Sequence, residues 1–150
     1  MKDNIIAEVS LTYKTKVRAS ERPKVNNSND AFEFFYSSWD QGTIEHIEEF
    51  KIMLLNRSNK VLGIASISKG GISGTAIDIK LIFQYVIKTN SSSIIEVHNH
   101  PSGNKEPSEA DIMITRKIKE ASNYMDVHLL DHLILIPDKE FYSMADNGII

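Results

Sequence analysis

Two histidines, an aspartate and a serine hydroxyl lie within the short stretch from His98 to Asp111. Residues 93–97, just before it, have the apolar, β-branched composition of a buried strand, and residues 101–103, Pro-Ser-Gly, end that strand. His98 and His100 therefore occupy positions i and i+2 at a strand end, where their side chains leave the same face about 6.6 Å apart along the strand. Neutral imidazole is a common zinc ligand, so the pair predicts a metal site.

A helix is predicted to follow Pro107 and to supply a third ligand. Ser108 can cap this helix, because apolar residues then recur at helical spacing, at Ala110, Ile114, Ile118 and Ala121. Asp111 falls in the first turn, so its carboxylate can reach the strand end and leave a fourth position to water, as in catalytic zinc sites. Ser-x-x-Asp is also the pattern of an ordinary capping box, and for this element alone the structural interpretation is the more common one.

The complete pattern, His-Asn-His-Pro-Ser-Gly-x-x-x-Pro-Ser-x-x-Asp, resembles that of the JAMM (MPN-domain) metallopeptidases, and among them the bacterial RadC branch. The likeness extends back to residues 48–50, Glu-x-Phe, and forward through residues 130–134 to residues 142–143. It covers about residues 45 to 150.

This resemblance implies an α/β fold, a cytidine-deaminase-like α/β/α sandwich with a central mixed sheet. It also implies one zinc ion per chain, held by His98, His100 and Asp111, and a catalytic Glu48. Glu96 stands where the family usually has an apolar residue, on the same strand face as the two histidines. Glu96 is therefore either a rival metal ligand or a partner that supports a ligand.

RadC proteins usually carry helix-hairpin-helix segments that suit DNA binding, whereas only some 45 residues precede the resembling region here. The formal net charge of −3 gives no overall attraction to nucleic acid. We therefore expect DNA binding to be weak at most, and the resemblance to metallopeptidases implies a peptide or protein substrate.

The composition is that of one globular domain, with 150 residues, 41% hydrophobic and 25% charged. The chain has no cysteine, which excludes disulfides, thiolate nucleophiles and the Pro-Cys-x-x-Cys zinc ligands of deaminases with the same fold. No signal peptide and no run of eighteen apolar residues is present, so we expect a cytoplasmic protein without a membrane partner.

Residues 1–30 are predicted to form an N-terminal strand and a basic connector, ahead of a single domain over residues 31–150. The strand is indicated by the alternating apolar residues Val9, Leu11 and Tyr13. The connector is basic at Lys14, Lys16, Arg18, Arg22 and Lys24. Such a run could contact phosphates, but a solvated connector is the more common interpretation. A helix with a core-facing aromatic stripe follows, formed by Phe32, Phe35, Tyr36 and Trp39.

A hairpin is predicted next, because the hydrophobic period changes to two. One face of its first strand carries Glu48, Phe50, Ile52 and Leu54, the other Glu49, Lys51, Met53 and Leu55, and the second strand runs from Val61 to Ile67. Glu48 therefore continues an apolar face, where burial raises the pKa of a carboxylate and proton transfer becomes possible. A glutamate at a strand start is usually solvated, so the catalytic assignment depends on the family resemblance.

Glycines at positions 70, 71 and 74 indicate a turn, and an amphipathic helix capped by Asp78 runs to about Asn90. We expect this helix to cover one face of the sheet and the helix after Ser108 to cover the other. Residues 127–136 are predicted as a core strand and residues 141–144 as a short closing strand.

His128 and the pair Asp131-His132 could be extra ligands or an acid/base pair. For the pair, a structural role beside the site is the more common interpretation.

Together with the family resemblance, the residues imply zinc-dependent hydrolysis of a peptide or isopeptide bond, with Glu48 accepting a proton from water and the Ser108 hydroxyl donating to the oxyanion. Two alternatives remain open. One is a DNA-maintenance or mobile-element accessory protein with a structural metal, and the other is an interaction module without metal. The intact ligand set favours the hydrolase over the module.

Overall fold

The computed structural model describes residues 7–10, 12–70 and 76–150. A short 3-10 helix, η1, covers Ala19–Glu21. The helices are α1 (Ser28–Ser38), α2 (Ile79–Thr89) and α3 (Glu109–Tyr124). The strands are β1 (Glu49–Leu55), β2 (Val61–Lys69), β3 (Ser93–Asn99), β4 (His128–Ile136) and β5 (Glu140–Ser143). The helices after Asn27, Asp78 and Ser108, the hairpin and the strands from residue 93 onward were all predicted.

The strands form one mixed sheet in the order β2-β1-β3-β4-β5. Only the β3–β4 pair is parallel among the described strands, and the other neighbours are antiparallel. Every residue of β1 and β3 is buried, because these central strands are covered on both faces. The predicted α/β class and mixed sheet are confirmed.

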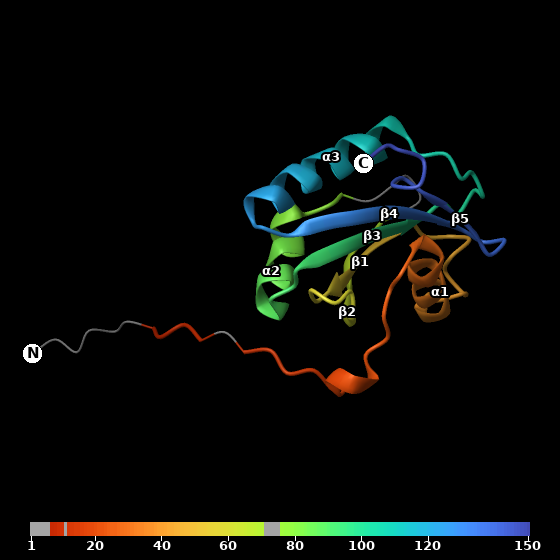
Figure 1. The fold of residues 1–150 in the computed structure, drawn as a ribbon. Coiled ribbons are helices and arrows are strands. Elements are labelled where there is room, and N and C mark those ends of the chain that lie inside the picture. Colours follow the sequence, from red (N-terminus) through yellow and green to blue (C-terminus); the bar gives the residue numbers. More distant parts are fainter. Residues whose placement is uncertain (1–6, 11, 71–75) are drawn as a thin grey trace, which may run out of the picture.

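The two faces of the sheet carry separate apolar clusters, and α1 covers one of them (Figure 1). Phe32, Phe35 and Trp39 from the α1 region pack there against Met53 and Leu55 of β1. On the opposite face, α2 and α3 pack against the other side of β1, through Ile82, Val86, Ile118, Phe50, Ile52 and Leu54. The alternation predicted for the first strand of the hairpin is therefore confirmed, and the fold is an α/β/α sandwich.

The prediction that the helices after Asp78 and Ser108 cover opposite faces is wrong, because both pack on the same face. Both β2 and β3 are antiparallel to β1, so they are parallel to each other, and β4 is parallel to β3. The crossovers β2-α2-β3 and β3-α3-β4 thus advance in the same direction across the sheet. Since such crossovers are right-handed, both helices must lie on one face.

The strand predicted around Val9 and Tyr13 is also wrong, since the described residues 7–10 and 12–15 form no strand. Leu11 lies outside the described residues, as do Gly71 and Gly74 of the predicted turn. Val9 is 92% exposed, and the Tyr13 hydroxyl donates to the Leu62 carbonyl oxygen at 3.0 Å. Alternation alone does not make a strand, which needs a partner to pair with its backbone.

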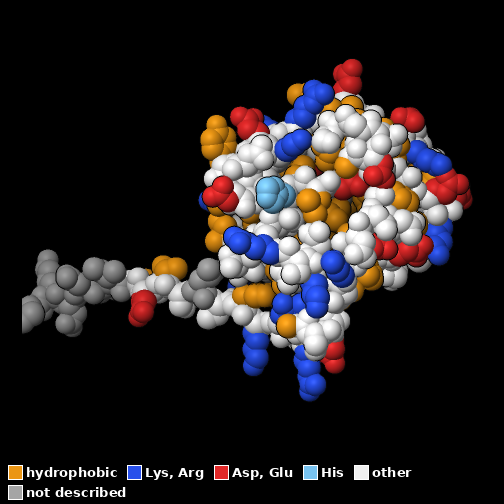
Figure 2. Space-filling model, in the orientation of Figure 1, with side chains coloured by type: hydrophobic (Ala, Val, Ile, Leu, Met, Phe, Trp, Pro, Cys, Tyr) orange, Lys and Arg blue, Asp and Glu red, His pale blue; other side chains and the backbone are white. Residues whose placement is uncertain are grey.

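The last part of the basic connector packs against the domain. Val25 is buried in the α1-side cluster, and its N–H donates to the Asn59 carbonyl at 2.9 Å. Lys24 forms an antiparallel bridge with Lys60. The described residues before η1 project away from the sheet (Figure 1), and Lys and Arg side chains are frequent at the lower edge of the molecule around η1 (Figure 2). Within the described ranges, no helix combines the length and apolar content needed to cross a bilayer.

Truncation at two points should separate the projecting segment from the packed one. Removing residues 1–18 should change the free energy of unfolding by less than about 0.5 kcal/mol, because its described residues, 7–10 and 12–18, are almost all exposed. Removing residues 1–26 should cost about 2–5 kcal/mol, because it also removes buried Val25 and backbone hydrogen bonds with Asn59 and Val61. Urea unfolding of the two truncated proteins measures the difference, and equal stabilities would contradict the packing of residues 19–26.

Candidate metal centre

The structure brings together the three side chains predicted to bind metal. His98 lies near the end of β3, His100 follows that strand, and Asp111 lies in the first turn of α3. The two histidine Nε2 atoms are 2.9 Å apart, and they lie 3.4 Å (His98) and 3.3 Å (His100) from the Asp111 carboxylate oxygens. Each residue offers a ligand atom within 4.8 Å of the others, and no other such group occurs among residues 7–10, 12–70 and 76–150. This cluster could hold a metal ion.

The electrostatics of the cluster favour a bound cation. Burial alone would raise the pKa of Asp111, but its contacts with His100 and His98 and with the Ser108 N–H hold that pKa well below its usual value. Burial alone would lower the pKa of His100, but its contacts with Asp111 and the Asn104 carbonyl, and the charge of Glu48, raise it. A carboxylate that stays ionised beside two imidazoles is a donor set that fits a divalent transition metal.

The loop after β3 orients His100. The His100 Nδ1 atom lies 2.6 Å from the Asn104 carbonyl oxygen, which can only accept, so Nδ1 carries a proton and Nε2 faces the cluster. Gly103 stands at φ +83°, a conformation that favours glycine and that lets the loop turn back beneath the imidazole.

Ser108 and Asp111 form the capping box that their spacing also predicted. The Ser108 hydroxyl accepts from the Asp111 N–H at 3.1 Å, and the Asp111 carboxylate accepts from the Ser108 N–H at 2.8 Å. The same carboxylate faces both histidines. The structural and metal-binding interpretations of Ser-x-x-Asp are thus compatible, because Asp111 Oδ2 accepts from the Ser108 N–H while both carboxylate oxygens face the histidines.

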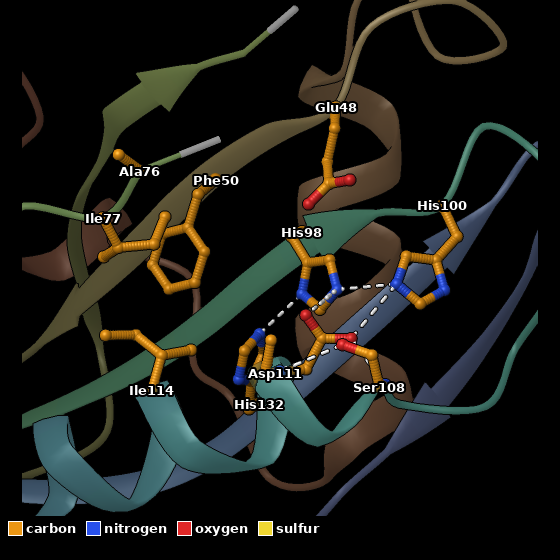
Figure 3. A pocket seen from close by; sticks show the side chains of 11 residues that line it. Glu48, Phe50, Ala76, Ile77, His98, His100, Ser108, Asp111, Ile114 and His132 are labelled. Carbon is orange, nitrogen blue, oxygen red and sulfur yellow. Dashed lines mark hydrogen bonds and ion pairs between the residues drawn. The ribbon is translucent and has the colours of Figure 1, made fainter. Parts of the chain in front are cut away.

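Glu48 lies where the predicted register places it, immediately before β1 and half-buried. Figure 3 shows its carboxylate pointing toward His98 and His100, on the opposite side of the cluster from Asp111 and Ser108. All five side chains line one cavity of about 650 Å³. One wall of this cavity is apolar and is formed by Phe50, Ala76, Ile77, Ala110 and Ile114.

Glu49 occupies the opposite face of the sheet, as predicted, and it is buried. Its carboxylate lies 3.6 Å from Lys51 Nζ and 3.4 Å from Lys69 Nζ, and it accepts from the Thr43 hydroxyl at 3.1 Å. Glu49 is therefore part of the architecture and cannot reach the cavity.

Asn99, between the two histidines, is a functional position that the spacing argument missed. Its side chain points to the α1 face, where its Nδ2 donates to the Ile44 and Ile47 carbonyls at 2.8 and 2.9 Å, and its Oδ1 accepts from the Glu49 N–H at 2.7 Å. Asn99 thereby holds the segment that carries Glu48. A polar amide at the end of a buried strand was the available signal, since such a group needs partners.

Glu96 is buried on the face of the cluster but is not one of its members. Its Oε2 lies 3.2 Å from His132 Nδ1, although neither carboxylate oxygen has a hydrogen bond of good geometry among the described residues. Burial raises the pKa of Glu96 well above its usual value. Glu96 therefore lies beside His132 and outside the cluster of His98, His100 and Asp111.

The side chains of Asp131 and His132 have different partners, and His128 lies away from the site. Asp131 accepts hydrogen bonds from the Ser143 hydroxyl at 2.6 Å and the Ala145 N–H at 3.0 Å, so it anchors the chain after β5. His132 is fully buried, with its Nε2 2.7 Å from His98 Nδ1, and burial lowers its pKa well below the usual value. His128 is exposed at the other end of β3, opposite Ser93.

His46 matches no ligand spacing in the sequence, but it lies close to the site. It lines a second, smaller pocket together with Glu45, Glu48, His100, Pro101 and Ser102. The segment between α1 and β1 therefore contributes more than Glu48 to the surroundings of the cluster.

Comparison with known proteins identifies the family of this chain. A family model described as the RadC-like JAB domain matches residues 25–149. The chain belongs to this family. Curated relatives described as UPF0758 proteins include one from Flavobacterium johnsoniae, 45% identical over 84% of this chain and 53% of the relative. Others come from Porphyromonas gingivalis (40% identical, 69% of this chain, 45% of the relative) and Clostridium beijerinckii (43%, 69% and 44%). The chain spans about half the length of these RadC-like relatives.

Substitution of the cluster residues tests metal binding directly. Wild-type protein should retain one zinc per chain, and His98→Ala, His100→Ala or Asp111→Ala should lose it, because two protein donors remain where three are needed. Glu96→Gln should retain zinc, because Glu96 lies outside the cluster. Elemental analysis of metal-loaded, desalted protein measures the content. Zinc lost from Glu96→Gln but kept by Asp111→Ala would make Glu96 the third ligand.

Proposed function

We propose that this chain is a zinc-dependent hydrolase that cleaves an amide bond in a peptide or isopeptide substrate. The observation that carries the proposal is the convergence of His98, His100 and Asp111 beside the half-buried carboxylate of Glu48, in one cavity. Membership of the RadC-like JAB family supports a hydrolase of this type.

Zinc is the metal that this donor set favours. Two imidazoles and one carboxylate, with no cysteine in the chain, match the three protein ligands of catalytic zinc sites, which leave a fourth position for water or substrate. When bound, zinc would supply a Lewis acid that lowers the pKa of water to about 7 and polarises a carbonyl group.

Glu48 is placed to move the proton that hydrolysis requires. Attack of water on an amide releases a proton, and the departing amine must gain one. The Glu48 carboxylate faces the cluster from the side opposite Asp111, so it can accept the first proton and donate it to the amine. Its backbone is held on both sides, because its carbonyl accepts from the Gly70 N–H at 2.9 Å and Asn99 fixes the neighbouring residues.

Ser108 is the proposed donor to the oxyanion. Its hydroxyl oxygen accepts from the Asp111 N–H, so the hydroxyl proton is not used by this bond and can be donated into the cavity. The apolar wall formed by Phe50, Ile77 and Ile114 can bind an apolar part of the substrate close to the scissile bond.

Glu48→Gln should abolish hydrolysis while zinc content and stability stay unchanged, because the amide keeps the size of the carboxylate but cannot accept a proton. The loss should appear in kcat and amount to about 10²–10⁴-fold. Steady-state kinetics on a substrate from a peptide and isopeptide screen, with elemental analysis of the same samples, measures both quantities.

Glu49→Gln is the matched control, one residue away on the opposite face. Activity per folded molecule should stay within a few fold of wild type, and unfolding measurements are needed because Glu49 pairs with Lys51 and Lys69. Wild-type turnover by Glu48→Gln would remove Glu48 from the mechanism and leave Glu96 as the next carboxylate to test.

A DNA-accessory function is the second candidate, and the projecting basic segment is the observation that favours it. We expect DNA binding with a dissociation constant no better than about 10⁻⁴–10⁻⁶ M at physiological salt, independent of sequence. Removing residues 1–18, with Lys14, Lys16 and Arg18, should weaken it further. Fluorescence anisotropy with labelled duplexes measures the affinity. Sub-micromolar binding by the truncated protein would favour the accessory function.

A further inference from the structure

A chain of buried hydrogen bonds connects the backbone of α3 to His98. The Thr115 hydroxyl lies 2.6 Å from the Asp111 carbonyl oxygen and 2.5 Å from His132 Nδ1. His132 Nε2 lies 2.7 Å from His98 Nδ1, and His98 Nε2 faces His100 and Asp111. Thr115 and His132 are both fully buried, so the chain is shielded from water.

The direction of each hydrogen bond follows from the first one. A carbonyl oxygen can only accept, so the single Thr115 hydroxyl proton must point to Asp111, since Met144 Sδ at 3.6 Å is a weaker and more distant acceptor. The Thr115 oxygen then accepts from His132 Nδ1–H. A neutral imidazole has one N–H, so His132 Nε2 accepts from His98 Nδ1–H. The opposite direction would place two oxygens without a proton between them 2.6 Å apart.

We infer that Thr115 and His132 are positioning residues that hold His98 in its Nδ1–H tautomer, with the Nε2 lone pair directed at the metal position. The inference rests on the metal centre of the proposed function. It concerns how the site is prepared for a cation, and it does not depend on which bond is cleaved.

The two predicted histidine ligands are thus prepared in different ways. His100 donates directly to the backbone carbonyl of Asn104. His98 is connected to a backbone carbonyl, that of Asp111, only through hydrogen bonds with His132 and Thr115. Partners that orient metal-binding histidines typically contribute about 10–100-fold to metal affinity. The residue Thr115 lies one turn after Asp111, so α3 supplies both a ligand and the start of the chain that orients another.

Thr115→Val is the decisive substitution, because valine keeps the shape of threonine but has no hydroxyl. Thr89→Val is the matched control, since the Thr89 hydroxyl also donates to the carbonyl four residues earlier, at 2.8 Å, but far from the site on α2. Thr115→Ser should rescue the effect because it restores the hydroxyl. The readouts are the imidazole ¹⁵N chemical shifts of the metal-free full chain, which distinguish the tautomers, and the zinc dissociation constant from chelator competition.

In wild-type, Thr89→Val and Thr115→Ser proteins we expect His98 in the Nδ1–H form and similar zinc affinities. In Thr115→Val we expect His98 to populate both tautomers and zinc to bind about 10–100-fold more weakly. A wild-type His98 in the Nε2–H form overturns the inference even if no variant folds. So does a Thr115→Val protein that keeps the Nδ1–H form and binds zinc within about twofold of wild type. Wild-type protein that binds no zinc would defeat the proposed function, while the tautomer measurement would still decide this inference.

Discussion

The pairing of β3 between an antiparallel and a parallel neighbour is the constraint on which the rest of the site depends. Antiparallel β1 brings its start, and with it Glu48, beside the end of β3 that carries His98. Parallel β4 brings His132 level with Glu96 on the same face. The right-handed return through α3 then sets Asp111 over the strand end. Residues more than 80 positions apart in the chain, such as Glu48 and His132, thus meet at one site on the inner strands of the sheet.

The same constraint makes the polar groups at the site costly, because β3 is buried along its whole length. Buried polar groups need partners, and a buried charge needs compensation. Asn99 satisfies this requirement on the α1 face with backbone groups, and His132 and Thr115 satisfy it on the other face. Glu96 is the exception, with burial raising its pKa and no hydrogen bond of good geometry among the described residues. Such an arrangement is retained where it orients a functional group rather than where it maximises stability.

Most elements could be predicted because their signals are local. Caps at Asp78 and Ser108 and the alternation in β1 depend only on neighbours in the sequence, and the motif joined His98 and His100 to Asp111 through family resemblance. The face covered by α3 could not be predicted, because it depends on strand order and on the direction of both crossovers. Alternation at Val9 was misleading because it found no partner strand.

The residues that orient the site were hidden for a related reason. Thr115 looks like an ordinary polar residue within a helix, and His132 gains its role only from the register of β4 against β3. Asn99 points away from the histidines that flank it. A spacing pattern reports which side chains share a face, whereas hydrogen bonds across the sheet depend on pairing between distant segments.

The capping box at the start of α3 links cation binding at the metal centre to the local stability of that helix end. Asp111 accepts the Ser108 N–H and also faces both histidines, so one carboxylate takes part in helix termination and in the cluster. Local opening of the first helical turn would withdraw this carboxylate, and a cation that holds it would oppose that opening by the same free energy. The affinity for a cation and the local stability of the α3 N-terminus are therefore thermodynamically linked, and amide protection in that turn would rise as the site is filled.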